Sequence, residues 1–268
     1  MTNIKIIAEI GWNHLGNMDL AEKMIVSAAK NGAQICKFQS WSVKNLKKGP
    51  WDSDGRLEIY NKAELSFEDH VKLIKICKSN SVDFMTSIFN SESIDMLKEL
   101  NIDFVKIPSH ENYNSELVVN IMNNFSSALI STGASKWTEI EQHINYFKKG
   151  NLIPMHCVSS YPCNSENINL PKISELRKIS NKIGYSGHLQ TIDDAIAAIS
   201  LGCSYIEKHF TIDKSLPGRD NQFAILPEDL KNLSNFRDTF EKMNINKGSD
   251  FQESEIDIIE NYRGRWGG

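Results

Sequence analysis

The chain has 268 residues, is 40% hydrophobic and carries 30 basic against 34 acidic side chains. This near-balance of charge argues against a nucleic-acid-binding surface. No apolar run approaches the roughly 20 residues that a membrane-spanning helix needs, and the amino-terminal residues resemble a strand rather than a signal peptide. The five cysteines have no metal-binding or redox spacing and fit a reducing cytoplasm. These features predict a cytoplasmic globular protein without a membrane partner, and they name no reaction.

Apolar, strand-like runs alternate with helix-like stretches along the whole chain. The expected strands are Ile4–Ile10, Gln34–Gln39, Asp83–Ser87, Phe104–Pro108, Ala128–Thr132, Leu152–Val158, Lys182–Ser186 and Tyr205–His209. The expected helices are Leu20–Asn31, Phe67–Ser79, Ser91–Leu100, Ser115–Asn123, Trp137–Lys148, Pro171–Ile179, Thr191–Leu201 and Pro227–Met243. Eight such strand–helix units predict an α/β fold, a single-domain TIM (β/α)8 barrel.

We assign residues 1–245 to the barrel domain and residues 246–268 to a short C-terminal extension. The stretch from about residue 40 to residue 65 is expected to be irregular, and a long loop at a barrel mouth is usually functional. The extension is expected to hold a helical piece near Glu253–Asn261 and to end in a basic, aromatic tail that is solvated and frayed.

The last two predicted strands stop close to a histidine, His188 and His209. Because the carboxyl ends of barrel strands line one mouth, the two imidazoles should converge there. Such a pair can hold a divalent metal and leave other positions open for substrate. The alternative is that each histidine only forms hydrogen bonds at its strand end. Two other histidines, His70 and His143, lie on predicted helices and are expected at the surface.

Two lysines, Lys37 and Lys106, lie where apolar strands end. Burying a lysine in a barrel mouth is costly unless an anion pairs with it. Together with serine and threonine hydroxyls on the neighbouring strands, the lysines favour a small, multiply charged ligand that carries a carboxylate and a phosphate. The alternative is a structural ion network in which the lysines pair with Glu9 or Glu111.

The polar strand ends form motifs in a characteristic order. They are Ala8-Glu9-Ile10-Gly11 with Asn13-His14, Lys37-Phe38-Gln39, Lys106-Ile107-Pro108-Ser109, Ser131-Thr132-Gly133, His156-Cys157-Val158-Ser159, Tyr161-Pro162, Gly184-Tyr185-Ser186 with His188, and Glu207-Lys208-His209-Phe210-Thr211. In this order the motifs resemble the sialic acid synthase family, which condenses phosphoenolpyruvate with an aldose to give a nonulosonic acid. The resemblance extends from about Ile4 to Leu230, nearly the whole barrel.

The resemblance implies a divalent metal at His188 and His209, with Mn²⁺ favoured over Mg²⁺ or Co²⁺. It implies that phosphoenolpyruvate is bound by Lys37, Ser87, Lys106, Ser109, Ser131 and Ser186, and Ser159 stands where some members have an asparagine that contacts this substrate. It places Glu9, Gln39, Glu111, Tyr161 and Asp220 at positions that handle the sugar, the metal-bound water or proton transfer. Of these, Glu9, Glu111 and Asp220 are the catalytic candidates. Family habit is also compatible with a homodimer.

Three departures from the family pattern concern the acceptor side of the site. Gly187 stands where the family usually has an aspartate, and Asn221 replaces a histidine that follows the position of Asp220. We also expect no counterpart of the family's C-terminal antifreeze-like domain. These differences predict an acceptor other than ordinary N-acetylmannosamine.

Two other functions compete with the synthase. A metal-dependent pyruvate aldolase would need the histidines but not the paired lysines, and it would release no phosphate. A barrel that binds sugar without catalysis would account for the three departures and would show ligand binding without turnover.

Overall fold

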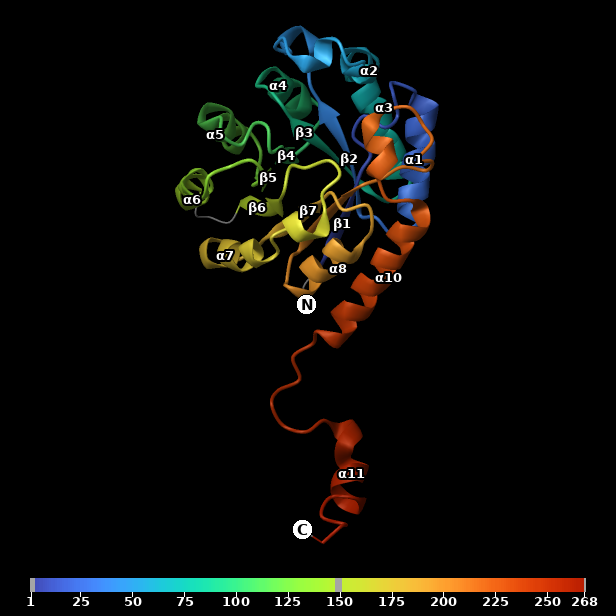
Figure 1. The fold of residues 1–268 in the computed structure, drawn as a ribbon, viewed down its shortest axis with the longest axis vertical. Coiled ribbons are helices and arrows are strands. Elements are labelled where there is room, and N and C mark those ends of the chain that lie inside the picture. The colour runs from blue at the N-terminus through green and yellow to red at the C-terminus, as the bar shows by residue number, and fades with distance from the viewer. Residues whose placement is uncertain (1–2, 148–150, 268) are drawn as a thin grey trace.

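A computed structural model describes residues 3–147 and 151–267. Eight parallel strands form a closed barrel in which sequence neighbours are also neighbours in the sheet (Figure 1). The strands are β1 (Lys5–Glu9), β2 (Ile35–Ser40), β3 (Asp83–Ile88), β4 (Phe104–Ile107), β5 (Ser127–Ser131), β6 (Leu152–Cys157), β7 (Gly184–Gly187) and β8 (Tyr205–His209). The predicted TIM barrel is confirmed.

Helices surround the barrel and connect successive strands. They are α1 (Met18–Lys30), α3 (Phe67–Ser79), α4 (Glu92–Glu99), α5 (Ser115–Asn124), α6 (Trp137–Tyr146), α7 (Pro171–Ile179), α8 (Asp193–Ser200) and α10 (Pro227–Met243). Each matches a predicted helix to within a few residues, and the predicted end of the fifth helix at Lys148 lies outside the described residues. Among the described residues, none of these helices could cross a membrane, because none is both long and apolar enough.

The prediction that residues 40–65 are irregular is wrong in part. Two short 3-10 helices, η1 (Val43–Asn45) and η2 (Pro50–Asp52), are followed by the helix α2 (Arg56–Ala63). Only Ala63 of α2 is buried, so the helix lacks the apolar stripe that marks the others in the sequence. A second short helix, α9 (Arg219–Phe223), lies between β8 and α10.

Side chains inside the barrel form an apolar layer below a polar one. The apolar layer consists of Ile7, Ile35, Met85, Leu129, Ile153 and Met155. Because side chains alternate along a strand, the inward residues two positions further on come from the same strands and lie nearer the carboxyl ends. Those residues include Glu9, Lys37, Ser87, Ser131 and Cys157, and all five are buried. The strand pattern therefore directs polar groups to one end of the barrel interior.

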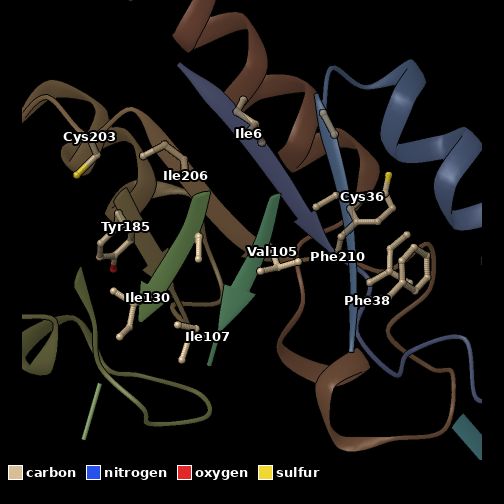
Figure 2. Close-up of a cluster of buried hydrophobic side chains, with 14 of the residues drawn as sticks. Ile6, Cys36, Phe38, Val105, Ile107, Ile130, Tyr185, Cys203, Ile206 and Phe210 are labelled. Carbon is tan, nitrogen blue, oxygen red and sulfur yellow. The ribbon is translucent and has the colours of Figure 1, made fainter. Parts of the chain in front are cut away.

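The outward-facing strand residues pack against the helices. Figure 2 shows members of this larger cluster, including Ile6, Phe38, Val105 and Phe210, each of them fully buried. Burial of this layer fixes which face of every strand points outward, because a shift of one residue would reverse the faces. The same shift would turn the polar layer out of the mouth.

The prediction that His70 and His143 lie at the surface is wrong, since both side chains are buried. His70 lies on α3, where Nδ1 donates to Ser66 O at 2.7 Å and Nε2 contacts Ser40 Oγ at 2.7 Å. His143 Nε2 lies 3.0 Å from Asn112 O. Both rings therefore have polar partners between the helices and the barrel, and such partners make burial of an imidazole tolerable.

The C-terminal extension holds the 3-10 helix η4 (Glu253–Glu255) and the helix α11 (Ile256–Asn261). Figure 1 shows α11 separated from the barrel by the segment that follows α10. Trp266 is 91% exposed, and the guanidinium of the neighbouring Arg265 lies 5.7 Å from its ring centroid, so the aromatic end of the tail is open to solvent.

Candidate active site

A cavity of about 620 Å³ opens at the carboxyl ends of the strands. Its wall contains nearly all of the side chains that the sequence predicts for the site: Glu9, Lys37, Gln39, Ser87, Lys106, Ser109, Glu111, Ser131, Tyr161, Ser186, His188, His209 and Asp220. Ser159 is not part of the wall, but its Oγ lies 4.0 Å from Sγ of the wall residue Cys157. The fold thus brings together groups that are up to about 200 residues apart in sequence.

The ends of β1 and β2 join Glu9, Lys37 and Gln39 in one polar group. Lys37 Nζ lies 2.8 Å from Glu9 Oε2 and donates to Ser87 Oγ at 2.9 Å. Gln39 Nε2 donates to Glu9 Oε1 at 2.7 Å. Glu9 is register partner to Lys37 on one side and to His209 on the other, which places this carboxylate between the lysine and histidine parts of the site.

The second lysine has a partner that the sequence reasoning missed. Lys106 Nζ lies 2.6 Å from Glu207 Oε1, and Ser186 Oγ donates to the same oxygen at 3.1 Å. Glu207 precedes His209 by two positions and therefore shares its inward face, which is the signal that could have identified it. Among the described residues Glu111 forms no ion pair with either lysine. The ion-network alternative was therefore right about Glu9 and wrong about Glu111.

The four charged groups perturb one another inside the barrel. Burial opposes the charge of Lys37, but the Glu207 and Glu9 carboxylates raise its pKa overall. Burial lowers the pKa of Lys106, which Glu207 offsets only in part. Burial would raise the pKa of Glu207, but the two ammonium groups hold it below its usual value. Carboxylates thus lie beside both lysines, next to a cavity that an anion can enter.

The wall near β4, β5 and β6 is shaped by a glycine. A Cβ at Gly133 would lie 2.2 Å from Ser159 Oγ and 2.7 Å from Ser109 Oγ, so only glycine lets both hydroxyls approach this backbone. The buried Asn112 donates to Ser131 O at 2.7 Å and to Gly133 O at 3.2 Å. Hydroxyls and amides concentrated in this way can bind phosphate or carboxylate oxygens.

The two predicted metal ligands lie side by side. The ring centroids of His188 and His209 are 5.5 Å apart. Val158 O lies 2.8 Å from His188 Nδ1 and leaves Nε2 of that ring available. Nδ1 of His209 is buried and has no hydrogen-bond partner among the described residues. Burial lowers the pKa of His188 to about 4 and holds the pKa of His209 well below its ordinary value. Neutral imidazoles are the form that binds metals.

The donor set fits a metal that the protein holds through two ligands. No group of three or more histidine, cysteine, aspartate or glutamate side chains with metal-binding geometry occurs among residues 3–147 and 151–267. The two imidazoles nevertheless suit a divalent cation of borderline softness, and Nδ1 of His209, unpartnered within the described part of the chain, is a nitrogen that could bind it. Water or substrate would take the other coordination positions of the cation.

Asp220 lies beside this pair, with Oδ2 3.5 Å from His209 Nδ1. Burial raises the pKa of Asp220 to about 7, although hydrogen bonding with Trp12 counteracts part of the shift. A carboxyl group with a pKa near neutrality can donate or accept a proton in the working range of an enzyme. Glu111 is only half-buried, and burial raises its pKa as well.

A cluster of aromatic side chains forms another part of the cavity wall. The ring of Trp12 stacks on that of Tyr60 at 4.9 Å and meets Trp41 edge-on at 6.2 Å. Tyr60 lies on α2, so the helical segment missed by the sequence analysis contributes to the cavity. Tyr161 packs against His188 with a centroid distance of 4.2 Å.

Asn221, one of the departures from the family pattern, is buried away from this wall. Thr211 Oγ1 donates to Asn221 Oδ1 at 2.6 Å, and Asn221 Nδ2 donates to Pro217 O at 2.7 Å. The side chain therefore fixes the loop that carries Asp220 and does not line the cavity.

A TIM barrel with paired lysines, clustered hydroxyls and two convergent histidines at its mouth defines an enzyme that joins a phosphate-bearing donor to a second substrate. A model of the NeuB family matches residues 24–248, and the chain belongs to this family. The predicted family is confirmed, and so is the classification as a transferase.

Relatives with assigned functions make sugar acids. An N,N'-diacetyllegionaminic acid synthase from Campylobacter jejuni is 34% identical, over 97% of this chain and 84% of the relative. An N-acetylneuraminate-9-phosphate synthase from Drosophila melanogaster is 35% identical, over 87% of this chain and 66% of the relative. The crystal structure of a sialic acid synthetase from Leptospira borgpetersenii superimposes with a TM-score of 0.88 at 29% identity, covering 99% of this chain and 93% of that one.

Proposed function

We propose that this protein condenses phosphoenolpyruvate with an acetamido sugar to give a sialic-acid-like 2-keto-3-deoxy acid and inorganic phosphate. The observation that carries the proposal is the pair of buried lysines, Lys37 and Lys106, at the floor of a cavity that also contains two neutral histidines. An aldolase that uses pyruvate has no need for two buried cations beside a cluster of hydroxyls. Family membership likewise favours the synthase over a barrel that only binds sugar.

Donor binding is assigned to the lysines and the hydroxyl cluster. An incoming phosphoenolpyruvate would exchange hydrogen bonds with Lys37, Lys106 and the hydroxyls of Ser87, Ser109, Ser131 and Ser186. Charge-assisted hydrogen bonds of this kind are roughly twice as strong as neutral ones. They hold carbon 3 of the donor toward the histidine side of the cavity, so that much of the catalysis is positioning.

We assign the divalent cation to His188 and His209, with Mn²⁺ the preferred ion over Mg²⁺ or Co²⁺. Imidazole ligands disfavour Mg²⁺, which prefers oxygen, and the choice of Mn²⁺ over Co²⁺ follows the family resemblance. A cation bound there would polarise the aldehyde of the open-chain sugar as a Lewis acid. Asp220, beside His209, is placed to give a proton to the aldehyde oxygen as carbon 3 attacks the aldehyde carbon.

Positive charge then develops at carbon 2 of the donor, and water adds there. Glu9, oriented by Gln39 and Lys37, is positioned to take the proton of that water. Phosphate leaves from the resulting tetrahedral carbon by cleavage of the C–O bond, and the two lysines stabilise its charge. Glu111 and Tyr161, which line the cavity, are assigned to the sugar.

For the acceptor we propose a sugar other than ordinary N-acetylmannosamine, with more than one acylated amino group. The Campylobacter relative is named for a product with two N-acetyl groups. The aromatic wall of Trp12, Trp41 and Tyr60 offers apolar surface against which acetyl methyl groups can pack. We further propose a cytoplasmic enzyme, because all five cysteines are buried and unpaired, and a homodimer.

The test is phosphate release from phosphoenolpyruvate with Mn²⁺, across mono- and diacetamido-hexoses and their phosphates. Release that depends on an acceptor supports the synthase and identifies its sugar. Donor binding by calorimetry without release for any acceptor would favour the sugar-binding alternative.

A further inference from the structure

A buried ion pair lies directly behind the two histidines, on the outer side of the barrel wall. Lys208 Nζ lies 2.9 Å from Asp194 Oδ1 and 3.0 Å from Oδ2, and the two side chains are 2% and 0% exposed. Lys208 immediately precedes His209 and has the opposite parity, so it points outward toward α8. Asp194 lies in the first turn of α8, where the helix dipole favours a negative charge.

This ion pair is bonded to both histidine-bearing strand ends. Gly187 and Lys208, the residues that precede the two histidines, are register partners between β7 and β8. Lys208 Nζ also donates to the carbonyl of Leu189, the residue after His188, at 2.7 Å. One ammonium group therefore holds the segment after His188 to the strand that carries His209.

Asp194 is held from a second direction by β7. Tyr185 Oη donates to Asp194 Oδ2 at 3.0 Å, and the phenol ring is itself buried. A Cβ at Gly187 would lie 2.2 Å from Asp194 Oδ2 and 2.5 Å from Cε1 of Tyr185. The space beside His188 that a side chain at position 187 would fill is thus taken by a carboxylate from α8.

We propose that the Lys208–Asp194 pair is a clamp that sets the separation of His188 and His209, and that residue 187 is glycine because the Asp194 carboxylate occupies its side-chain space. Lys208, Asp194 and Tyr185 are positioning residues, since none of them lines the cavity. The inference rests on the assignment of the metal to His188 and His209 in the proposed function. It explains the departure at Gly187 as an exchange of one carboxylate for another.

The experiment measures Mn²⁺ binding by titration calorimetry to chelator-treated protein, together with its melting temperature in the absence of metal. The variants are Asp194→Asn, Lys208→Met, the double variant and the milder Tyr185→Phe, which removes one hydrogen bond and keeps the ring. Loss of the groups that orient metal ligands costs about 10–100-fold in metal affinity, and we expect a loss near the lower bound for each charge variant. The double variant should lose no more than the worse single variant, because the two groups act as a unit.

Arg237→Met is the matched control. Arg237 is a buried cation that donates to Gly32 O and Ser234 Oγ, near the amino end of β2 and remote from the histidines. We expect a lower melting temperature and an unchanged Mn²⁺ affinity for this variant.

The outcomes distinguish a failure of the clamp from a failure of the metal assignment. Folded Asp194→Asn, Lys208→Met and Tyr185→Phe proteins that bind Mn²⁺ as the parent does, with only their melting temperatures lowered, would overturn the clamp and leave the metal assignment intact. A parent protein that binds no Mn²⁺ would overturn the metal assignment and the clamp with it. Weakened Mn²⁺ binding in these variants, set against unchanged binding in Arg237→Met, supports the clamp.

Discussion

Lys106 Nζ lies 2.6 Å from Glu207 Oε1, and both side chains are buried at the floor of the barrel mouth. Glu207 also lies 3.7 Å from Lys37 Nζ through the same oxygen. One carboxylate therefore stands between the two cations that the proposed function assigns to the donor. In the absence of substrate, the Glu207 carboxylate balances charge on both buried lysines. An anionic substrate has to share the lysines with Glu207 or replace it as their partner.

Glu207→Gln removes that compensation. Breaking a buried ion pair by removing one partner costs about 3–5 kcal/mol, so the substrate-free protein should unfold at a clearly lower denaturant concentration. Phosphoenolpyruvate should restore part of the loss, because its own charges then pair with the lysines. The control is Glu175→Gln, which removes an exposed partner of Lys178 and should cost at most about 1 kcal/mol. Equal stability of the two variants would contradict the account.

Lys37→Met and Lys106→Met should each weaken phosphoenolpyruvate binding. A hydrogen bond to a charged group contributes about 1.5–3 kcal/mol, which corresponds to roughly 10–150-fold in Kd. Calorimetry with phosphoenolpyruvate measures this directly. The exposed Lys44, which pairs with Glu92 at the surface, supplies the control Lys44→Met. Parent-like affinity in both buried-lysine variants would remove the donor assignment.

Asp220 should make stability depend on pH in the metal-free protein. Its pKa is raised by burial to about 7, whereas an aspartate in an unfolded chain titrates near ~3.9. Between these values the folded state keeps a proton that the unfolded state has lost, so this contribution to stability is full at low pH, falls as pH rises through the window and is level above it. Asp220→Asn should show a smaller decline over the same window in denaturant titrations. An identical decline in both proteins would show that Asp220 is not the group responsible.

Asp220 should also determine how the activity depends on pH. If protonated Asp220 supplies the proton to the aldehyde oxygen, kcat/KM should fall as pH rises past the pKa of this carboxyl group. Asp220→Asn should have low activity without that falling limb. If kcat/KM of Asp220→Asn still falls over the same pH range, the titrating group is another residue.

His188→Ala and His209→Ala should abolish acceptor-dependent phosphate release, and added metal should not rescue either variant. In the parent protein a chelator should remove activity and Mn²⁺ should restore it, because the fold holds both histidines in place when the metal is absent. His143→Gln, on α6 and outside the cavity wall, is the control and should keep its activity. Full activity in both alanine variants would refute the metal assignment.

Truncation after Asn261 tests the aromatic tail. Because Trp266 is 91% exposed, we expect acceptor KM and melting temperature to stay at parent values. A raised acceptor KM with unchanged donor affinity would instead place the tail in the acceptor site.

The strands and most helices could be predicted from the sequence because each buries one regular apolar face. The exceptions have no such face. In α2 only Ala63 is buried, and α9 spans five residues, so neither carries enough periodicity to stand out. His70 and His143 were misplaced because their hydrogen-bond partners come from distant segments.

The site was predictable where a residue contradicted the pattern around it. Lys37 and Lys106 stand out because lysine does not suit an apolar strand. Glu207 is likewise a charged residue in an apolar strand, but it lies two positions before the predicted metal ligand His209, so the sequence pattern assigns it to that motif. Only the three-dimensional structure connects Glu207 with Lys106. The relation of Gly187 to Asp194 could not be predicted, because it depends on the approach of α8 to a strand end.

The most direct test of the central claim uses phosphoenolpyruvate with a heavy oxygen isotope at the bridging position between carbon 2 and phosphorus. The account predicts that acceptor, Mn²⁺ and enzyme together release phosphate that carries the label, in equal amount to the sugar acid formed, because the C–O bond is cleaved. Unlabelled phosphate would mean P–O cleavage and a different reaction. Labelled donor that remains intact with every acetamido sugar would contradict the proposed synthase.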